Sequence, residues 1–110
     1  MSYAVLYTKT AVNDLDQAID YIDHILLNPS AADHLLDTLE SKLDHLKDFP
    51  KTHELVDDPF FKAHGIRYIA VKNYLAFYTV DEDQHIVYII RFLYAKRDWI
   101  NVLKDAFFQR

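Results

Sequence analysis

The chain has 110 residues, 51% of them hydrophobic and 26% charged, which is the size and composition of one globular domain covering residues 1–110. Acidic residues outnumber basic ones by 17 to 12. The net charge of -5 of the whole chain disfavours binding to a nucleic acid or an anionic membrane. The lack of cysteine excludes disulfides, thiolate nucleophiles and cysteine-ligated zinc, and the single glycine excludes glycine-rich phosphate-binding loops. The sequence shows no secretion signal and no apolar run that could span a membrane, so we expect a cytoplasmic protein that needs no cofactor.

The charge is unevenly distributed along the chain. Residues 10–58 contain twelve acids and three lysines, a net charge of −9, whereas residues 62–110 contain eight bases and five acids, a net charge of +3. All four arginines lie in the second half: Arg67, Arg91, Arg97 and Arg110. A site for an anion is therefore expected in the second half of the chain.

The first half reads as a short strand followed by two helices. Residues 3–8 are rich in β-formers, and from residue 11 to 26 apolar residues recur at steps of three and four, opposite a row of aspartates. Either Thr8 or Thr10 is expected to cap this helix. The Asn-Pro pair at residues 28–29 ends it, and a second helix is expected to begin around Ser30 and Asp33. The short connection predicts an antiparallel helical hairpin with one apolar side.

The second half reads as a loop, three strands and a final helix. The periodicity lapses over residues 51–65, and strand-like runs follow at residues 66–71, 74–80 and 86–93, joined by short polar turns. A last amphipathic helix is expected to follow Asp98, which we expect to cap it. The order β, α, α, β, β, β, α predicts an α+β fold with an antiparallel meander.

The predicted meander is apolar on both faces, because apolar residues occupy both sets of alternating positions in residues 86–93. In a regular strand Ile90 and Phe92 would share one face, and Val87 and Ile89 the other. The helical hairpin can cover only one face of the sheet. We expect the final helix or a partner chain to cover the second face.

The histidines and serines do not form a pattern typical of catalysis or metal binding. His24 follows Asp20 by four residues and His34 precedes Asp37 by three, and such pairs on an acidic helix surface are usually solvated ion pairs. None of the three serines lies in a nucleophile motif. We therefore predict no metal site and no serine hydrolase.

The segment 91–97 is the strongest candidate for chemistry. Arg91 interrupts the apolar alternation of the last strand, which requires either a salt bridge to a carboxylate or a bound anion. Tyr94, Lys96 and Arg97 follow where the strand ends and the helix begins, and their cations with free backbone N–H groups could hold a phosphate. The residues leave the two alternatives for Arg91 open.

The second half also carries a recognisable motif pattern. An arginine opens the first meander strand (Arg67), followed by V-K-N-Y-x-x-F-Y-x-V-D-E at residues 71–82, I-x-R at residues 89–91 and K-R-D-W at residues 96–99. This pattern resembles the RelE/ParE superfamily, the toxins of bacterial type II toxin–antitoxin modules, often called plasmid stabilisation proteins. The resemblance extends over nearly the whole chain and implies a βααβββ fold, usually with a C-terminal helix.

The resemblance implies a toxin that a cognate antitoxin holds inactive, either as a hetero-oligomer with that antitoxin or with the toxin itself forming a homodimer. RelE-like members are metal-free mRNA interferases, endoribonucleases that cleave mRNA on the ribosome, and we expect this activity first. ParE-like members instead poison DNA gyrase without catalytic residues, which is the alternative. A degenerate, non-toxic binding domain is the second alternative.

For a nuclease, the resemblance implies that Arg67, Arg91 and Arg97 bind and polarise the phosphate and that Tyr94 acts as acid or base. The sequence departs from the nuclease pattern at Leu75, where RelE-like nucleases commonly carry an arginine after the tyrosine of the middle strand.

Overall fold

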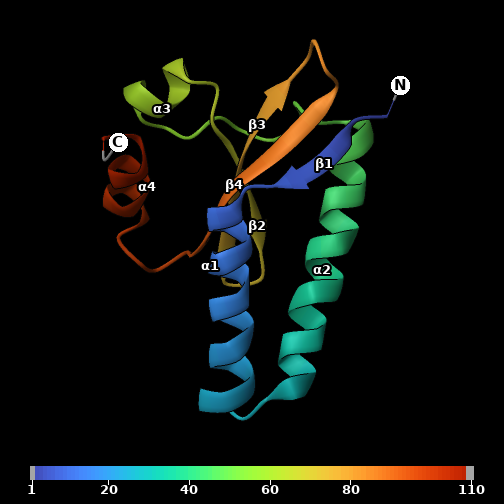
Figure 1. Cartoon of the computed structure of the whole chain (residues 1–110), viewed down its shortest axis with the longest axis vertical. Helices are drawn as coiled ribbons and strands as arrows, with labels where there is room; N and C mark the ends of the chain where they lie inside the picture. The colour runs from blue at the N-terminus through green and yellow to red at the C-terminus, as the bar shows by residue number, and fades with distance from the viewer. Residues whose placement is uncertain (1, 109–110) are drawn as a thin grey trace.

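The computed structural model of the chain describes residues 2–108, and of residues 106–108 only the backbone. In chain order the elements are β1 (Ala4–Tyr7), α1 (Lys9–Asp20), the π-helical turn η1 (Tyr21–Ile25), α2 (Pro29–Asp48), α3 (Pro59–Ala63), β2 (Arg67–Val71), β3 (Tyr74–Asp81), β4 (Ile86–Tyr94) and α4 (Trp99–Phe108) (Figure 1). This is the predicted α+β fold. The one additional element is α3, which lies in the stretch expected to be a loop.

The four strands form one mixed sheet in the order β1-β4-β3-β2. The meander β2–β3–β4 is antiparallel as predicted, and β1 joins its edge parallel to β4. Lys72 in the β2–β3 turn and His85 before β4 have φ angles of 56° and 58°, so both turns use the left-handed region without glycine. The β2–β3 turn lies at the same end of the sheet as the end of β4, because Tyr74 pairs with Tyr94.

The helical hairpin begins and turns at specific caps. The Thr8 hydroxyl accepts a hydrogen bond of 3.1 Å from the Ala11 N–H, which selects Thr8 of the two predicted caps. The second helix begins earlier than expected, at Pro29, because the Asn28 side chain accepts from the Ala31 N–H and a proline fits the first helical position. Between them the end of the first helix widens into η1.

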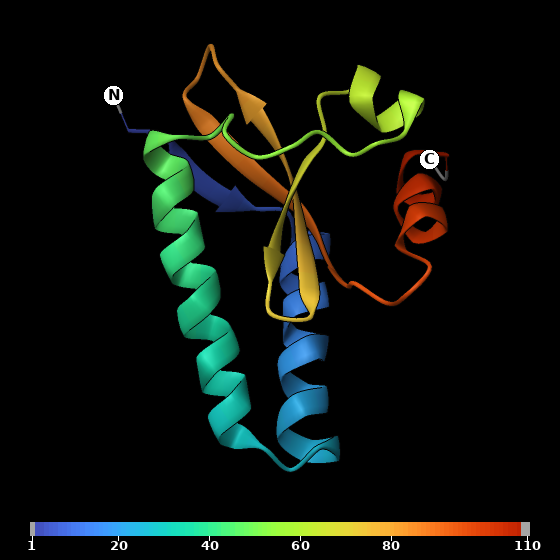
Figure 2. The same ribbon diagram turned by 180° about the vertical axis from the view of Figure 1, so that it is seen from behind.

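The hairpin covers one face of the sheet and forms the first core with it (Figures 1 and 2). The small residues Ala11 and Ala18 let α1 approach the sheet, and four leucines of α2 complete the contact. Members of this core that come from the sheet are Ile69, Val71, Ala76, Tyr78, Val87, Ile89 and Phe92. The apolar stripe predicted from periodicity is thus buried as far as Ile22, whereas its last members, Ile25 and Leu26, and Leu36 on α2 are exposed.

The second face is covered by α3 and α4, which lie on the side of the sheet away from α2 (Figure 2). Phe61 of α3 and Leu103 of α4 are fully buried against Phe77 and Leu93 of the sheet. Asp58 caps α3 by accepting from the Phe60 N–H at 2.9 Å, and its carboxylate lies 3.4 Å from Lys104 Nζ of α4. The final helix therefore covers the second face, one of the two predicted solutions.

A β-bulge in β4 changes which side chains point to which face. Tyr78 of β3 pairs with Ile89, whereas the preceding Phe77 pairs with Arg91, so Ile90 has no partner in the ladder. The prediction that Ile90 and Phe92 share a face was wrong, because the extra residue reverses the alternation: Phe92 packs in the first core and Ile90 against the second. The Thr8 hydroxyl donates to the Ile90 carbonyl at 3.1 Å and holds the bulge.

Candidate functional site

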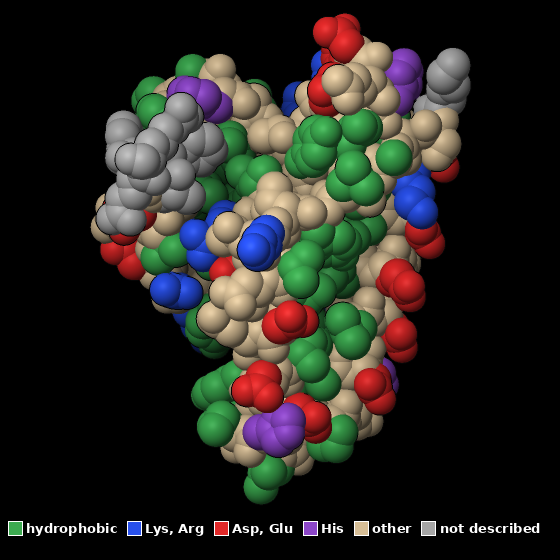
Figure 3. Space-filling view, viewed as in Figure 1, with side chains coloured by type: hydrophobic (Ala, Val, Ile, Leu, Met, Phe, Trp, Pro, Cys, Tyr) green, Lys and Arg blue, Asp and Glu red, His purple; other side chains and the backbone are tan. Residues whose placement is uncertain are grey.

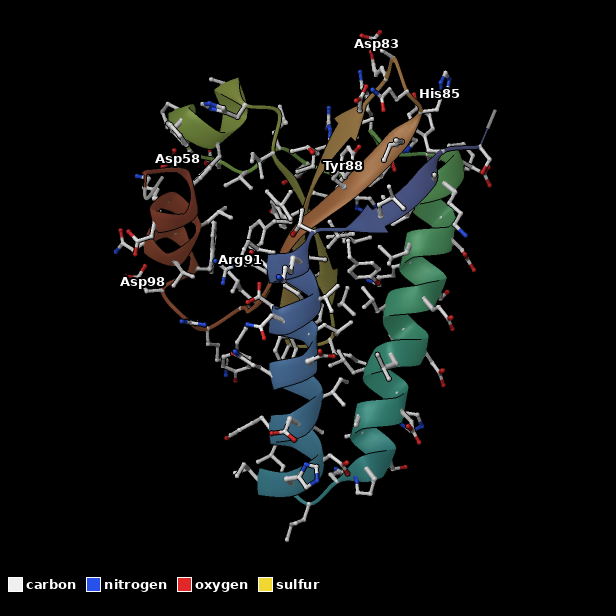
Figure 4. The ribbon with its side chains drawn as sticks, in the orientation of Figure 1. Asp58, Asp83, His85, Tyr88, Arg91 and Asp98 are labelled. Atoms are coloured by element: carbon white, nitrogen blue, oxygen red, sulfur yellow. The ribbon has the colours of Figure 1, made fainter. Side chains whose placement is uncertain are left out.

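Arg91 forms a bidentate ion pair with Asp14 of α1. Its Nε lies 2.7 Å from Oδ2 of Asp14 and its Nη2 lies 3.0 Å from Oδ1. The two side chains are only 16% and 9% exposed. Figure 4 shows Arg91 beside the first turns of α1. Of the two alternatives left open by the sequence, the structure therefore contains the salt bridge to a carboxylate.

The bulge explains why this pair forms. A regular strand would direct Arg91 into the first core with Val87 and Ile89, where an unpaired charge is costly. The Asp14 carboxylate also accepts the backbone N–H of Phe92 at 3.1 Å, so it ties α1 to β4 just beyond the bulge. The Asp14 carboxylate therefore balances the charge of the Arg91 guanidinium and accepts hydrogen bonds from two of its nitrogens.

A cleft of about 780 Å³ lies between the hairpin and the end of the sheet where β4 finishes. We call it the sheet-end cleft. Its lining comes from α1 and the start of α2 on one side, and from the β2–β3 turn and the end of β4 on the other: Asp14, Gln17, Ala18, Tyr21, Ile22, Leu26, Ala31, His34, Leu35, Lys72, Asn73, Tyr74, Phe92, Leu93, Tyr94 and Arg97. Tyr94 and Arg97, two of the four predicted site residues, thus meet in one cleft.

Three aromatic rings line the sheet side of the cleft. Tyr74 and Phe92 are stacked, with ring centroids 5.0 Å apart and planes inclined by 8°, and Tyr94 meets Tyr74 edge-on at 5.6 Å. Burial, with Tyr94 and Tyr21 nearby, raises the pKa of Tyr74 above its ordinary value. The Tyr74 phenol is therefore neutral at physiological pH and serves as an apolar wall with a hydrogen-bonding tip.

Two cations stand at the same cleft. Lys72 comes from the β2–β3 turn and Arg97 from the segment after β4, and both side chains are exposed. Backbone hydrogen bonds shape that segment: the Ala95 N–H donates to Asn73 O at 2.8 Å and the Arg97 N–H to Tyr94 O at 3.1 Å. The cleft combines an apolar floor with positive charge at one rim, which suits an amphipathic anionic ligand.

Arg67, the fourth predicted residue, lies elsewhere. It opens β2, five residues before Lys72 of the turn that borders the cleft, which is about 16 Å along a strand. Its Nη1 donates to the His53 carbonyl at 2.7 Å, and it lines a different hollow beside the acidic β3–β4 turn. Across the ladder from it, the buried Tyr78 donates to Pro50 O at 2.9 Å, and burial raises the pKa of Tyr78 to about 12. Arg67 therefore pins the segment after α2 and does not join Tyr94 and Arg97.

The sequence interpretation missed the hairpin side of the cleft. Asp14 and Gln17 of α1 and Tyr21 of η1 recur at steps of three and four, with the small Ala18 among them, so they form one stripe that faces the end of the sheet. That spacing could have indicated a polar stripe on the first helix from the sequence. It does not indicate which strand lies opposite the stripe.

The described residues contain no cluster of three or more histidines and acids that could hold a metal ion. His24 Nδ1 lies 2.9 Å from Asp20 Oδ1 on the exposed helix surface, as an isolated pair. Within residues 2–108, no helix has the length and apolar character needed to cross a bilayer.

Comparison with known proteins places this architecture among bacterial toxins. A family model described as the ParE toxin of the type II toxin–antitoxin system parDE matches residues 5–99. Among solved structures, the chromosomal ParDE system of P. aeruginosa superimposes with a TM-score of 0.67 at 17% identity, covering 86% of this chain and 98% of that one. The RelBE2 toxin–antitoxin complex of Mycobacterium tuberculosis gives 0.60 at 20% identity, with 86% and 99% covered. Free E. coli RelE gives 0.61 at 16%, with 93% of each chain covered. No curated protein sequence matches the chain.

Proposed function

This chain belongs to the ParE toxin family of type II toxin–antitoxin systems, and on that premise we propose that it arrests growth by binding DNA gyrase in the cytoplasm. The observation that carries the proposal is the state of the predicted catalytic set. Arg91 is held by Asp14, and Arg67 lies at the other end of β2. Phosphodiester cleavage without a metal needs several groups converging on one phosphate, whereas a gyrase poison needs only a binding surface.

A cognate antitoxin is the partner that neutralises the toxin. The sheet-end cleft supports this pairing, because Lys72 and Arg97 flank an apolar floor that an acidic amphipathic segment would fill. The P. aeruginosa and M. tuberculosis structures are themselves described as toxin–antitoxin systems. An antitoxin segment in the cleft would bury the exposed rings of Tyr21 and Tyr94, which are 50% and 41% exposed in the chain alone.

Ribosome-dependent mRNA cleavage is the second candidate function. It is favoured by the meeting of Tyr94, Arg97 and Lys72 in one cleft, beside an aromatic stack on which a base could lie. In this mechanism the cations would stabilise the phosphate charge and Tyr94 would transfer the proton, as the family resemblance implies.

One experiment separates the two functions. The toxin is expressed under tight control, with and without the antitoxin gene, and scored for growth, transcript integrity and DNA-damage signalling, while purified toxin is added to gyrase supercoiling assays. The proposal predicts inhibited supercoiling, intact transcripts, and equal toxicity of Tyr94→Phe, Arg97→Ala and wild type. Cleaved mRNA, with toxicity abolished by Arg97→Ala in a folded protein, would establish the nuclease instead. Normal growth without the antitoxin would indicate the degenerate binding domain.

A further inference from the structure

The turn of the helical hairpin carries four large apolar side chains that are exposed to solvent. We call these residues the hairpin tip: Tyr21, Ile25, Leu26 and Leu27. Their exposed fractions are 50%, 67%, 55% and 78%. The hairpin projects beyond the sheet at this end, away from α3 and α4 (Figures 1 and 2). Figure 3 shows hydrophobic side chains gathered there. Neither core of the fold buries them.

The backbone at the tip is unusual as well as exposed. η1 replaces the last turn of α1, with the Leu26 N–H donating to Tyr21 O at 3.0 Å across five residues. Leu27 then adopts a φ of 51°, in the left-handed region that favours glycine or asparagine. A leucine in that conformation gains nothing from packing, because most of its side chain is in solvent. The fold itself gives no reason for leucine at this position.

The helical hairpin that carries the tip is rich in acids, and the nearest cations, Lys72 and Arg97, lie on the other side of the sheet-end cleft. Residues 10–41 contain seven acids and no lysine or arginine. Arg91 neutralises Asp14, and His24 pairs with Asp20 on the exposed surface. The remaining acids of this stretch are Asp16, Asp23, Asp33, Asp37 and Glu40. Figure 3 shows acidic side chains along both sides of the hairpin. The tip is therefore an apolar end among the acids of the hairpin, which we call the acidic ring; Lys72 and Arg97 lie beyond it, across the cleft.

We propose that the hairpin tip is the surface by which the toxin docks onto its target protein, at an apolar depression of the target ringed by lysine and arginine. The inference rests on the proposed function, since it names the surface that a binding toxin would use. The acidic ring repels anionic lipid and nucleic acid and steers the toxin to a basic protein surface. A second copy is a poor occupant, because two tips in contact would bring their acidic rings together.

The same geometry explains neutralisation. Tyr21 and Leu26 belong both to the hairpin tip and to the lining of the sheet-end cleft. An acidic antitoxin segment that enters the cleft toward Lys72 and Arg97 therefore covers half of the tip. The antitoxin would block target docking by overlap, without contacting the target.

The test compares a tip variant with a matched control. Ile25→Gln/Leu27→Asn removes the two most exposed apolar side chains and places asparagine where the left-handed backbone favours it, so folding is preserved. Phe49→Ser is the control, since Phe49 is 52% exposed at the opposite end of α2. The full-length proteins are compared for growth arrest, for inhibition of purified gyrase at 50 and 300 mM salt, for antitoxin binding and for oligomeric state.

We expect the concentration needed for half-inhibition of gyrase to be at least tenfold higher for the tip variant than for wild type, and the tip variant to lose growth arrest. Phe49→Ser should change the half-inhibition concentration less than twofold and should still arrest growth. Wild-type inhibition should weaken several-fold at the higher salt, because the interaction is charge-steered. A tip variant that arrests growth like wild type overturns the inference, as does one that only loses antitoxin binding or only dissociates a dimer. If the wild-type toxin stops growth without affecting supercoiling, gyrase is not its target. The comparison of growth arrest between the tip variant and wild type then tests whether the tip is the docking surface.

Discussion

The hairpin tip and the sheet-end cleft are neighbouring regions that share an apolar character and differ in charge. The tip carries exposed apolar side chains within a purely acidic stretch, and the cleft carries an aromatic floor with Lys72 and Arg97 at its rim. The Asp14–Arg91 pair ties α1, the helix that leads to the tip, to β4, the strand that ends at the cleft. Opposite charges on adjacent apolar surfaces would let one small protein bind two partners of opposite charge, as we propose, and the shared residues would make that binding exclusive.

Breaking the ion pair between α1 and β4 should have the largest effect. Arg91→Ala leaves the Asp14 carboxylate nearly buried without its cation, which we expect to cost about 2–3 kcal/mol of unfolding free energy. Asp14→Ala should cost a similar amount. The measurement is urea denaturation of both single variants and the double variant.

The double variant provides the control for this prediction. Its loss should be smaller than the sum of the two single losses by at least about 1 kcal/mol, because each single change strands a charge. Strict additivity would mean that Arg91 is free to bind an anion in solution.

Reversing one cleft charge should weaken antitoxin binding and spare toxicity. Arg97→Glu places a negative charge at the rim where we propose the acidic segment lies, and we expect at least tenfold weaker binding, about 1.4 kcal/mol. Lys96→Glu is the matched control, since it makes the same charge change one residue away, outside the cleft lining. Titration calorimetry measures both. Equal losses for the two variants would argue for a general charge effect and against a seated segment.

The smallest effect concerns His53, which lies in the segment after the C-terminal end of α2. The Nε2 atom of His53 is buried without a hydrogen-bond partner, and burial, followed by the nearby His45 and Lys42, lowers the pKa of His53. In the unfolded chain this histidine takes up a proton near pH 6.5, before the folded form does. Stability should therefore be lost as the pH falls below about 6.5.

Urea midpoints between pH 8 and 5.5 measure this pH dependence. His53→Gln should flatten it, because glutamine does not titrate. A slope that persists unchanged in His53→Gln would assign the acid sensitivity to other groups.

Much of the fold could be predicted because its signals are local. Steps of three and four residues indicated the hairpin, alternation indicated the meander, and the apolar second face required a cover that α4 supplies. The helix α3 was missed, since five residues are too few for a periodic pattern. Asn28 was read as a stop signal, whereas it also caps the next helix.

The candidate site was predictable only in part. Tyr94 and Arg97 were placed correctly in one region because they are three residues apart at the end of one strand. The grouping of Arg67 with them assumed that all basic residues of the meander converge. The strand lengths instead put Arg67 at the far end of β2.

The sequence by itself determined the order of the strands and of the longer helices, the separation of negative and positive charge, and the family pattern, since each depends on neighbouring residues or on composition. Only the tertiary structure decided the environment of Arg91. One unpaired residue, Ile90, reverses the alternation of β4, and the carboxylate that receives Arg91 is 77 residues away along the chain. A shift of one residue in register leaves the amino-acid pattern unchanged and moves every later side chain to the other face, which is why the three-dimensional pairing had to supply this part of the answer.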